Sequence, residues 1–343
     1  MNPVEYFEEA LALFEGATSY STDQITIAER KVHLKAIGDP DLRDLFLPSL
    51  AHLLDLSTVF SPDLTIWYGE DKHLSKKMKA PPWEGFNGQG YNADLSQDDV
   101  QVFFQPWQTQ IFLYSASRKT GIYWVRKSED VPWWECTFSF RAIFHLWSRD
   151  LPAQLVHAGA ISKNGSGVLI TGQSGSGKTT SCLNLLRAGY DYLGDDYVWV
   201  ELDEQIKVYT LYHTAKIEPE NLDKRFAEWK GKIRNKSEYR SQKAIFDIKD
   251  LYPEAAVAVT ALKAILLPKV AHQETTHYVR ANPTQSLMAM APTTLHHLPH
   301  NRQNAYQKMM RISSNLPGYH WHLGSERTQF LTSFYDFFNN DIT

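Results

Sequence analysis

The sequence predicts an α+β / α/β protein in which an α+β domain over residues 1–150 precedes an α/β domain over residues 151–343. Three observations favour this organisation: short strand-like runs in the first part, an apolar run that leads through a glycine-rich turn into a helix in the second, and a change of composition near residue 150. Of the 343 residues, 43% are hydrophobic and 22% charged, which is enough apolar material for a packed core.

The first domain is predicted from periodicity. Val4, Phe7, Leu11 and Phe14 recur at helical spacing and predict a helix over Pro3–Glu15. Apolar runs between turn-rich segments predict two more helices, over Leu42–Leu56 and Phe138–Trp147, and four strands, over Leu64–Tyr68, Val100–Phe104, Gln110–Tyr114 and Ile122–Val125. These strands predict a small, largely antiparallel sheet without a chemical signature. We therefore expect this domain to act as a scaffold or in substrate recognition.

The second domain contains the most diagnostic motif of the chain. The apolar run Gly167–Thr171 predicts a buried strand, which enters Gly172–Thr179 and then a helix over Lys178–Ala188. The turn fits Gly-x-x-x-x-Gly-Lys-Ser/Thr at every position, so it is a P-loop motif. Its glycines allow backbone N–H groups to surround an anion, and the helix N-terminus adds a positive dipole end.

The P-loop predicts a binding site for ATP and Mg²⁺. Lys178 is expected to reach the β- and γ-phosphates, and the hydroxyl of Thr179 is expected to bind Mg²⁺. The residues predicted to contact the nucleotide are Gly172, Gln173, Ser174, Gly175, Ser176, Gly177, Lys178, Thr179 and Thr180. Because P-loops also serve motors, switches and transporters, the reaction has to be inferred from the neighbouring residues.

An acidic pair follows the P-loop helix. Asp195 and Asp196 lie 16 and 17 residues after Thr179, at the end of an extended segment. That return path can bring the pair beside the P-loop, where one carboxylate could support Mg²⁺ and the other could accept a proton from an attacking hydroxyl. Spacing alone leaves open the alternative that Gly194-Asp195-Asp196 is an ordinary turn at a strand end.

These motifs resemble bacterial HPr kinase/phosphorylase over about residues 155–255. The resemblance rests on the P-loop with its strand, on a histidine 15 residues before Gly172, and on acidic residues 23 and 24 after it. Two further matching segments are Arg187-Ala188-Gly189 and Glu238-Tyr239-Arg240, the second of which precedes an Ile-x-Asp-Ile stretch. The resemblance implies a P-loop domain of the HPr kinase and phosphoenolpyruvate carboxykinase type, with a mixed sheet.

The resemblance also implies roles for individual residues. Asp196 would be the proton acceptor, with His157 as a catalytic neighbour, and Asp195 and Glu238 would join Thr179 around Mg²⁺. Taken alone, a histidine in an apolar approach strand is more often a core residue, and Glu238 in its charged run is more often solvated.

The chain departs from the family in two places. The family's later basic segment is not reproduced, and either Lys269 or Arg280 could supply the missing positive charge at the transferring phosphate. The long aromatic-rich first domain is more similar to HPr-kinase-like proteins of peptide modification, including lasso-peptide kinases. This implies a serine or threonine of a peptide or protein as the acceptor, or a small alcohol, in place of HPr.

Composition excludes several other classes. A net charge of −4 and a pI of about 6.4 give no global attraction for nucleic acid or anionic lipid. Two cysteines, Cys136 and Cys182, imply no disulfide framework and suit a reducing compartment. The first residues lack the basic start of a signal peptide, and no apolar run approaches the roughly 18 residues of a membrane span. We therefore expect a cytoplasmic protein without nucleic-acid or membrane partners.

Together these observations predict a Mg²⁺-dependent kinase that transfers the γ-phosphoryl group of ATP to a hydroxyl. One alternative is a nucleotide-regulated sensor without an acceptor, and another is a P-loop NTPase coupled to motion. The acidic pair favours the kinase, because a sensor needs no base beside the γ-phosphate. The sequence leaves open the use of other nucleotides or pyrophosphate, the reversibility of transfer, and a homo-oligomeric state.

Overall fold

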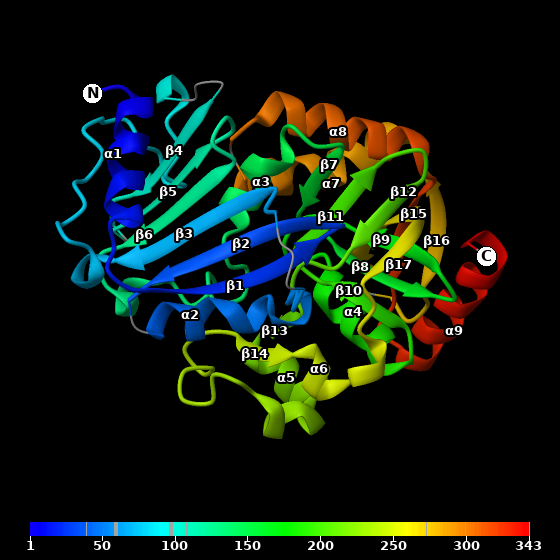
Figure 1. Cartoon of the computed structure of the whole chain (residues 1–343). Helices are drawn as coiled ribbons and strands as arrows, with labels where there is room; N and C mark the ends of the chain where they lie inside the picture. Colours follow the sequence, from blue (N-terminus) through cyan, green and yellow to red (C-terminus); the bar gives the residue numbers. More distant parts are fainter. Residues whose placement is uncertain are drawn as a thin grey trace. The chain divides into compact units, whose positions relative to one another are not determined.

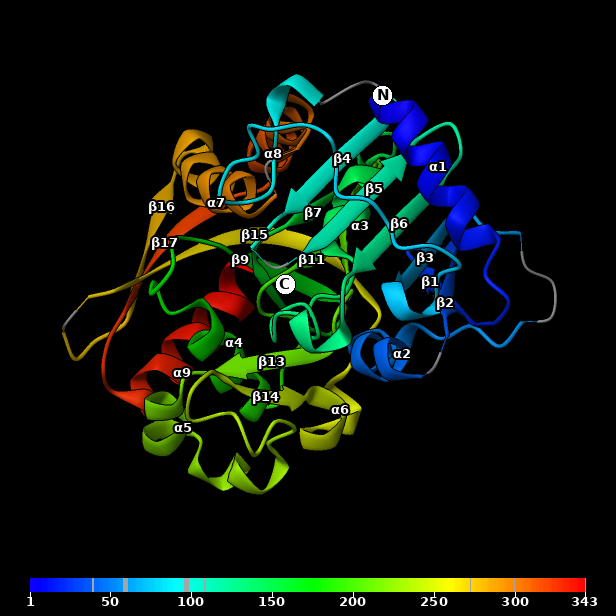
Figure 2. The same cartoon turned by 90° about the vertical axis from the view of Figure 1, so that its left-hand side faces the viewer.

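A computed structural model describes residues 1–38, 40–57, 61–95, 99–107, 109–271, 273–298 and 300–342. The chain divides into two compact units, one formed by Met1–Leu151 with Leu298–Asn301 and the other by Pro152–His297 with Arg302–Thr343. Each unit combines helices with a mixed sheet (Figures 1 and 2), so the predicted α+β / α/β fold class is confirmed. Within the described ranges, no helix is long and apolar enough to cross a membrane.

The N-terminal unit contains a six-stranded sheet in the order β1-β2-β3-β6-β5-β4. Its strands are β1 (Tyr20–Ile27), β2 (Arg30–Ile37), β3 (Leu64–Glu70), β4 (Val100–Gln105), β5 (Gln110–Ser115) and β6 (Thr120–Val125). The last three strands form an antiparallel meander, whereas β3 runs parallel to both β2 and β6. The largely antiparallel sheet predicted from the sequence is therefore mixed, because long crossovers precede and follow β3 and return the chain in the same direction.

Of the three helices predicted for this unit, one has the predicted bounds and two differ from prediction at their ends. Helix α1 (Pro3–Glu15) has the predicted bounds, and its Asn2 and Glu5 form a capping box. The predicted helix over Leu42–Leu56 was too long: α2 (Asp41–Phe46) gives way to two short 3₁₀ turns, since Pro48 cannot continue an α-helical hydrogen-bond ladder. Helix α3 (Arg141–Ser148) begins three residues later than predicted, after Phe140 in a left-handed conformation.

The β1–β2 hairpin was missed in the sequence. Its alternating apolar residues Ile25, Ile27 and Val32 are buried, but its two-residue turn, Ala28-Glu29, lacks the Asn-Gly or Asp-Gly pair that marks such hairpins. Both turn residues adopt the left-handed conformation, with φ values of 46° and 67°. The register of the two strands thus imposes on the turn a conformation that its own residues disfavour.

The C-terminal unit contains a nine-stranded sheet whose main path is β10-β8-β9-β15-β12-β11-β7, with β17 beside β15 and β16 beside β17. These strands are β7 (Ala153–Val156), β8 (Gly159–Lys163), β9 (Ser166–Ile170), β10 (Asp191–Gly194), β11 (Val198–Leu202), β12 (Ile206–Tyr209), β15 (Val259–Val270), β16 (His277–Ala281) and β17 (Gly318–Leu323). A separate hairpin pairs β13 (Thr214–Ile217) with β14 (Ala244–Asp247).

Helices cover both faces of this sheet. They are α4 (Lys178–Arg187), α5 (Pro219–Arg225), α6 (Ile248–Leu251), α7 (Pro283–His297), α8 (Arg302–Asn315) and α9 (Arg327–Phe337). Successive residues of β9 point to opposite faces: Val168 and Ile170 share one core with α4, whereas Leu169 lies in a second core with α7 and α8. Strand β9 is thus buried on both faces, as its unbroken apolar run predicts.

Strand directions determine where the functional residues gather. Strand β8 is antiparallel to both β9 and β10, so the latter two run in the same direction and end at the same edge. Strands β7 and β8 are joined by only two residues, His157 and Ala158, although four other strands lie between β7 and β8 in the sheet. A flat sheet would place those strands about 24 Å apart, whereas this connection spans at most about 11 Å. The sheet must therefore curl, which brings His157 toward the ends of β9 and β10.

The strained hairpin turn gives a test of the N-terminal unit. Replacing Glu29 by glycine removes the steric cost of the left-handed conformation, and we expect Glu29→Gly to raise the free energy of unfolding by about 0.5–1 kcal/mol. Urea denaturation measures this change. Glu29→Val, whose branched side chain opposes that conformation, should lower the midpoint instead. A glycine variant less stable than the parent protein would contradict the described turn.

Candidate active site

The P-loop lies between β9 and α4 and has the backbone geometry of an anion cradle. Gly175 and Gly177 have φ values of +78° and +103°, in the left-handed region that favours glycine. Gly177 is the N-cap of α4, so the helix N-terminus opens directly onto the loop. A Cβ at Gly177 would lie 2.7 Å from Leu323, which leaves no room for a larger residue.

Lys178 folds back over the P-loop. Its Nζ donates hydrogen bonds to the carbonyl oxygens of Gly172 (2.7 Å) and Gln173 (3.1 Å). Burial lowers the pKa of Lys178, while the nearby Asp196 and Asp195 carboxylates oppose this shift. The buried ammonium therefore lies within the curve of the loop, where the motif predicts the β- and γ-phosphates.

The aspartate pair follows the last residue of β10, at the sheet edge that also carries the P-loop. Gly159 of β8 makes this approach close: a Cβ there would lie 2.5 Å from Cys182 Sγ of α4 and 3.2 Å from the Asp195 Cα. Asp195 is 2% exposed. The structure therefore brings both carboxylates to the beginning of the P-loop helix.

Asp196 is held from two sides. His157 Nε2 lies 3.5 Å from Asp196 Oδ1, and Lys216 Nζ lies 3.2 Å from Asp196 Oδ2. The two partners come from different segments, the β7–β8 connection and strand β13. Lys216 was missed by sequence reasoning, because one lysine in the short run Thr214–Ile217 forms no motif.

His157 packs among polar and aromatic groups of its own unit. Its backbone N–H donates to Thr294 Oγ1 at 3.1 Å, and its ring lies 4.7 Å from the His297 ring and 5.1 Å from that of Tyr197. Burial lowers the pKa of His157, an effect that Asp196 partly offsets. A neutral imidazole beside Asp196 is therefore the favoured state at neutral pH.

The two aspartates differ in protonation. Burial, followed by the charge of Asp196, raises the pKa of Asp195 to about 7, against the opposing effect of Lys216. Burial also acts to raise the pKa of Asp196, but Lys216 and His157 outweigh it and hold that pKa below its ordinary value. The pair therefore combines a firmly ionised carboxylate with one that is readily protonated.

Asp195 and Thr179 suit a magnesium ion. The hydroxyl of Thr179 stabilises the charged form of Asp195, yet its Oδ2 atom has no hydrogen-bond partner among the described residues. An unpaired buried carboxylate oxygen is costly, and a hard divalent cation would satisfy it. Because the P-loop hydroxyl lies beside this carboxylate, these two residues would hold Mg²⁺.

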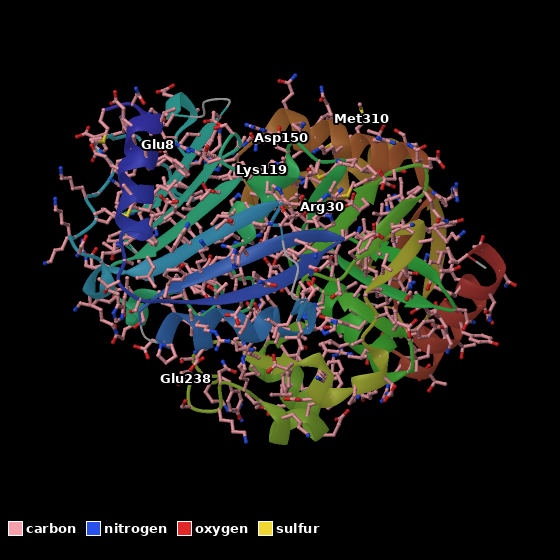
Figure 3. The ribbon with its side chains drawn as sticks, in the orientation of Figure 1. Glu8, Arg30, Lys119, Asp150, Glu238 and Met310 are labelled. Atoms are coloured by element: carbon pink, nitrogen blue, oxygen red, sulfur yellow. The ribbon has the colours of Figure 1, made fainter. Side chains whose placement is uncertain are left out.

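In the described part of the chain, the structure shows no contact between Glu238 and the P-loop or the aspartate pair. Its side chain is exposed and accepts a hydrogen bond from the Ser237 hydroxyl, in the segment between α5 and β14 (Figure 3). Among the described residues, no group of three or more His, Cys, Asp or Glu side chains is arranged to hold a metal. A metal-binding role for Glu238 therefore stays a prediction.

Lys269 and Arg280 are the two basic residues that the sequence offers for contact with the transferring phosphate. Both are exposed on strands β15 and β16, and the guanidinium of Arg280 stacks over the Tyr319 ring at 4.7 Å. The cationic side chain that contacts Asp196 is that of Lys216. The choice between Lys269 and Arg280 at the transferring phosphate stays a prediction.

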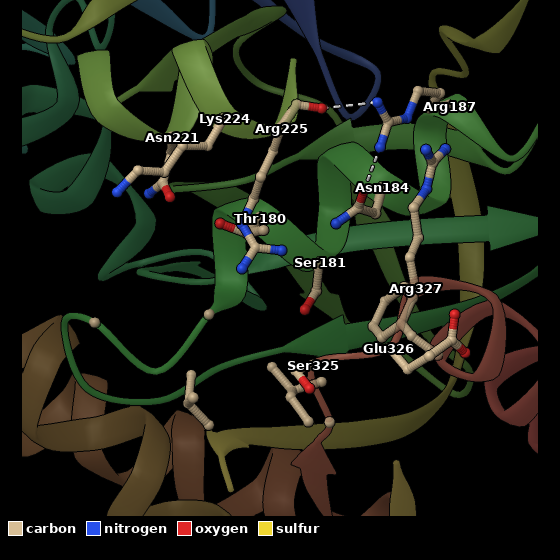
Figure 4. A pocket seen from close by; sticks show the side chains of 16 residues that line it. Thr180, Ser181, Asn184, Arg187, Asn221, Lys224, Arg225, Ser325, Glu326 and Arg327 are labelled. Atoms are coloured by element: carbon tan, nitrogen blue, oxygen red, sulfur yellow. Dashed lines mark hydrogen bonds between the residues drawn. The ribbon is translucent and has the colours of Figure 1, made fainter. Parts of the chain in front are cut away.

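A cavity of about 540 Å³ lies beside the P-loop and α4 (Figure 4). Thr180, Ser181 and Asn184 line its helical wall. Four cationic side chains also line it, those of Arg187, Lys224, Arg225 and Arg327. Arg187 donates to the Arg225 carbonyl oxygen at 2.9 Å, and the Arg225 side chain extends toward Thr180 (Figure 4). The sequence gave no signal for this cavity, because α5 and the segment 324–330, both distant from the P-loop in sequence, supply much of its lining.

Comparison with known proteins points to one family. The chain is similar to HPr kinase/phosphorylase. It is 33% identical over 93 residues to the protein of that name from Bacillus cereus (strain B4264), and equally similar to that from Bacillus anthracis (strain A0248). Each match covers 27% of this chain, and the chain spans 29% of the length of these curated relatives. The resemblance found in the sequence is thus confirmed. No family model matches the chain.

Among solved structures, the HPr(Ser) kinase/phosphatase of Coxiella burnetii matches 53% of this chain and 95% of its own, with 14% identity and a TM-score of 0.32. At this score the fold assignment rests on the strands and helices described above. The similarity to the curated relatives is limited to a minority of each protein, so activity, substrate and partners are inferred from the site.

The P-loop geometry gives the first functional test. Lys178→Ala removes the ammonium that lies within the loop, and we expect it to lower the affinity for Mg²⁺–ATP at least about tenfold or to abolish turnover. Calorimetric titration of ATP into both proteins measures the effect. Lys163→Ala, on the neighbouring strand β8, serves as a control that should bind normally. Equal binding by the Lys178 variant would contradict the assigned nucleotide site.

The raised pKa of Asp195 gives a test by pH. A metal ion needs the ionised carboxylate, so protonation of Asp195 competes with Mg²⁺; affinity should fall as the pH is lowered from about 8 to about 6. Titrations of Mg²⁺ and ATP at several pH values measure this dependence. Because ATP itself takes up protons in this range, Asp195→Asn provides the reference. An identical pH dependence in that variant would remove Asp195 from the metal site.

Proposed function

We propose that this protein transfers the γ-phosphoryl group of ATP to a hydroxyl group, with Mg²⁺ as cofactor. The observation that carries the proposal is the position of the Asp196 carboxylate, held by His157 and Lys216 at the sheet edge that also carries the P-loop. A group that only sensed nucleotide would not need a proton acceptor there. The similarity to HPr kinase/phosphorylase supports the same class of reaction.

Each of these residues would have a role in a direct transfer of the γ-phosphoryl group. The loop amides and Lys178 bind the β- and γ-phosphates, and Thr179 and Asp195 hold Mg²⁺, which neutralises phosphate charge when bound. The acceptor oxygen forms a bond to the γ-phosphorus while the bond from that phosphorus to the β–γ bridging oxygen breaks. ADP leaves with that oxygen, and the hydroxyl proton passes to Asp196.

The cavity beside α4 supports a nucleoside triphosphate as the donor in preference to pyrophosphate. It opens from the P-loop through Gly175 and Gly177, has a volume suited to a base with its ribose, and is lined by a phenyl ring, Phe330, as well as by arginines. An aromatic ring and guanidinium planes can stack on a base, whereas pyrophosphate would leave this cavity without a ligand.

For the acceptor we propose a serine or threonine hydroxyl of a peptide or protein. The curated relatives are named for a protein acceptor, HPr, and the N-terminal unit contains a second cavity of about 750 Å³. Both acidic and basic side chains line it, including Glu70, Lys72 and Arg126, and Phe104 and Trp124 add apolar surface. Mixed charge with aromatic surface suits a peptide better than a small alcohol.

Asp196→Asn separates the kinase from the sensor. The variant keeps the size of the side chain but removes the base, so we expect ATP affinity within a few-fold of wild type and transfer reduced by at least about 100-fold. The assay is transfer of label from γ-labelled ATP to pooled serine and threonine peptides. Asp191→Asn, at the start of β10, which precedes Asp196, is the matched control and should transfer normally.

Two outcomes would contradict the proposal. Full transfer by Asp196→Asn would reject Asp196 as the base. Tight ATP binding by the wild-type protein without transfer to peptides, protein extract or small alcohols would favour the nucleotide sensor.

A further inference from the structure

Lys216 is a largely buried lysine beside Asp196 to which the proposed function gives no role. Its side chain is 10% exposed, and its ammonium contacts Asp196 Oδ2 at 3.2 Å. Burying a lysine is costly unless it meets an opposite charge, and burial lowers the pKa of Lys216 while Asp196 opposes that shift. A lysine placed at such a cost beside the reacting group has a stronger claim to function than an exposed one.

Strand β13 holds Lys216 in place from several directions. Lys216 pairs with Ile245 of β14 in an antiparallel register, and the Tyr192 hydroxyl donates to the carbonyl of Thr214 at 3.3 Å. Ala215 and Ile217 are buried in the core that α4 also lines. Because side chains alternate along a strand, Lys216 points away from that core, toward Asp196.

The contacts of Asp196 are divided between its two oxygens. His157 takes Oδ1 and Lys216 takes Oδ2, and the two partners approach from separate segments of the chain. This arrangement fixes the rotation of the carboxylate about its terminal bond. A carboxylate has about four acceptor positions, so it can still accept a hydrogen bond from a substrate hydroxyl.

We propose that Lys216 is a positioning residue for phosphoryl transfer, which together with His157 orients Asp196 toward the acceptor hydroxyl. The inference rests on the proposed function and adds to it a residue on a strand outside the P-loop and the acidic motif. It gives Lys216 a role at Asp196, separate from the contact with the transferring phosphate for which Lys269 and Arg280 are the candidates. Lys216 acts through Asp196, so its effect exists only while Asp196 is present.

A double-mutant cycle tests this dependence. Lys216→Met keeps the length of the side chain and removes the charge; it should lower transfer from γ-labelled ATP by about 100-fold, with ATP affinity changed by less than a few-fold. Lys216→Arg, which retains a cation, should recover at least about tenfold of this loss. In the Asp196→Asn background, Lys216→Met should change the rate by less than about twofold.

Controls separate positioning from loss of structure. Lys207→Met replaces an exposed lysine on β12 and should leave transfer unchanged, and urea midpoints show whether each variant is folded. Wild-type transfer by Lys216→Met would overturn the proposal. So would an equal loss in both backgrounds, because a purely structural role does not depend on Asp196.

A crystal structure of Lys216→Met tests, independently of activity, whether Lys216 orients Asp196. We expect the Asp196 carboxylate to rotate away from His157 once its second partner is gone. An unchanged carboxylate would overturn the positioning role. If the wild-type protein transfers no label to peptides or to water, the proposed function fails, while the orientation of Asp196 in this variant still tests what Lys216 does.

Discussion

The candidate site depends on one close approach between backbone segments. At Gly159, strand β8 meets the first turns of α4 and the backbone of Asp195 with no space for a Cβ. This contact sets the distance between the P-loop helix and the acidic pair. A methyl group there would have to displace Cys182 or Asp195, so the geometry of phosphate and metal binding rests on a residue that touches neither.

Electrostatics act within that geometry. Two adjacent carboxylates in a largely buried site repel each other, and burial disfavours the charge of both. Lys216, Lys178 and the neutral His157 resolve this conflict unequally, since Asp196 has two direct partners and Asp195 has an unpaired oxygen. In the proposed reaction Asp196, oriented by two partners, would be the proton acceptor, and Asp195, with its unpaired oxygen, would be the metal ligand.

Local patterns in the sequence were enough to predict the strand, turn and helix that form the P-loop. The run from β9 through the P-loop into α4 has a period, a turn and a helix start of its own, and the bounds found in the structure agree with it. The placement of His157 near the acidic pair could be anticipated only from the resemblance to HPr kinase/phosphorylase. Its physical cause, the curl of the sheet between β7 and β8, leaves no local trace in the sequence.

What the sequence could not predict is built from distant segments. Lys216 is one lysine in a short apolar strand, and the cavity beside α4 is completed by α5 and by the residues after β17. The β1–β2 hairpin could not be predicted because the pairing of its strands, and not the residues of its turn, determines the turn conformation. The metal-binding role of Glu238 came from the resemblance alone and stays a prediction; its carboxylate is exposed.

A crystal structure of the protein with Mg²⁺ and a non-hydrolysable ATP analogue tests the central claim most directly. The account predicts the β- and γ-phosphates within Gly172–Thr179, the metal in contact with Thr179 and Asp195, and the nucleoside in the cavity beside Arg225. The γ-phosphate should face Asp196. A nucleotide bound elsewhere, or a metal held by other residues with Asp195 still unpaired, would contradict it.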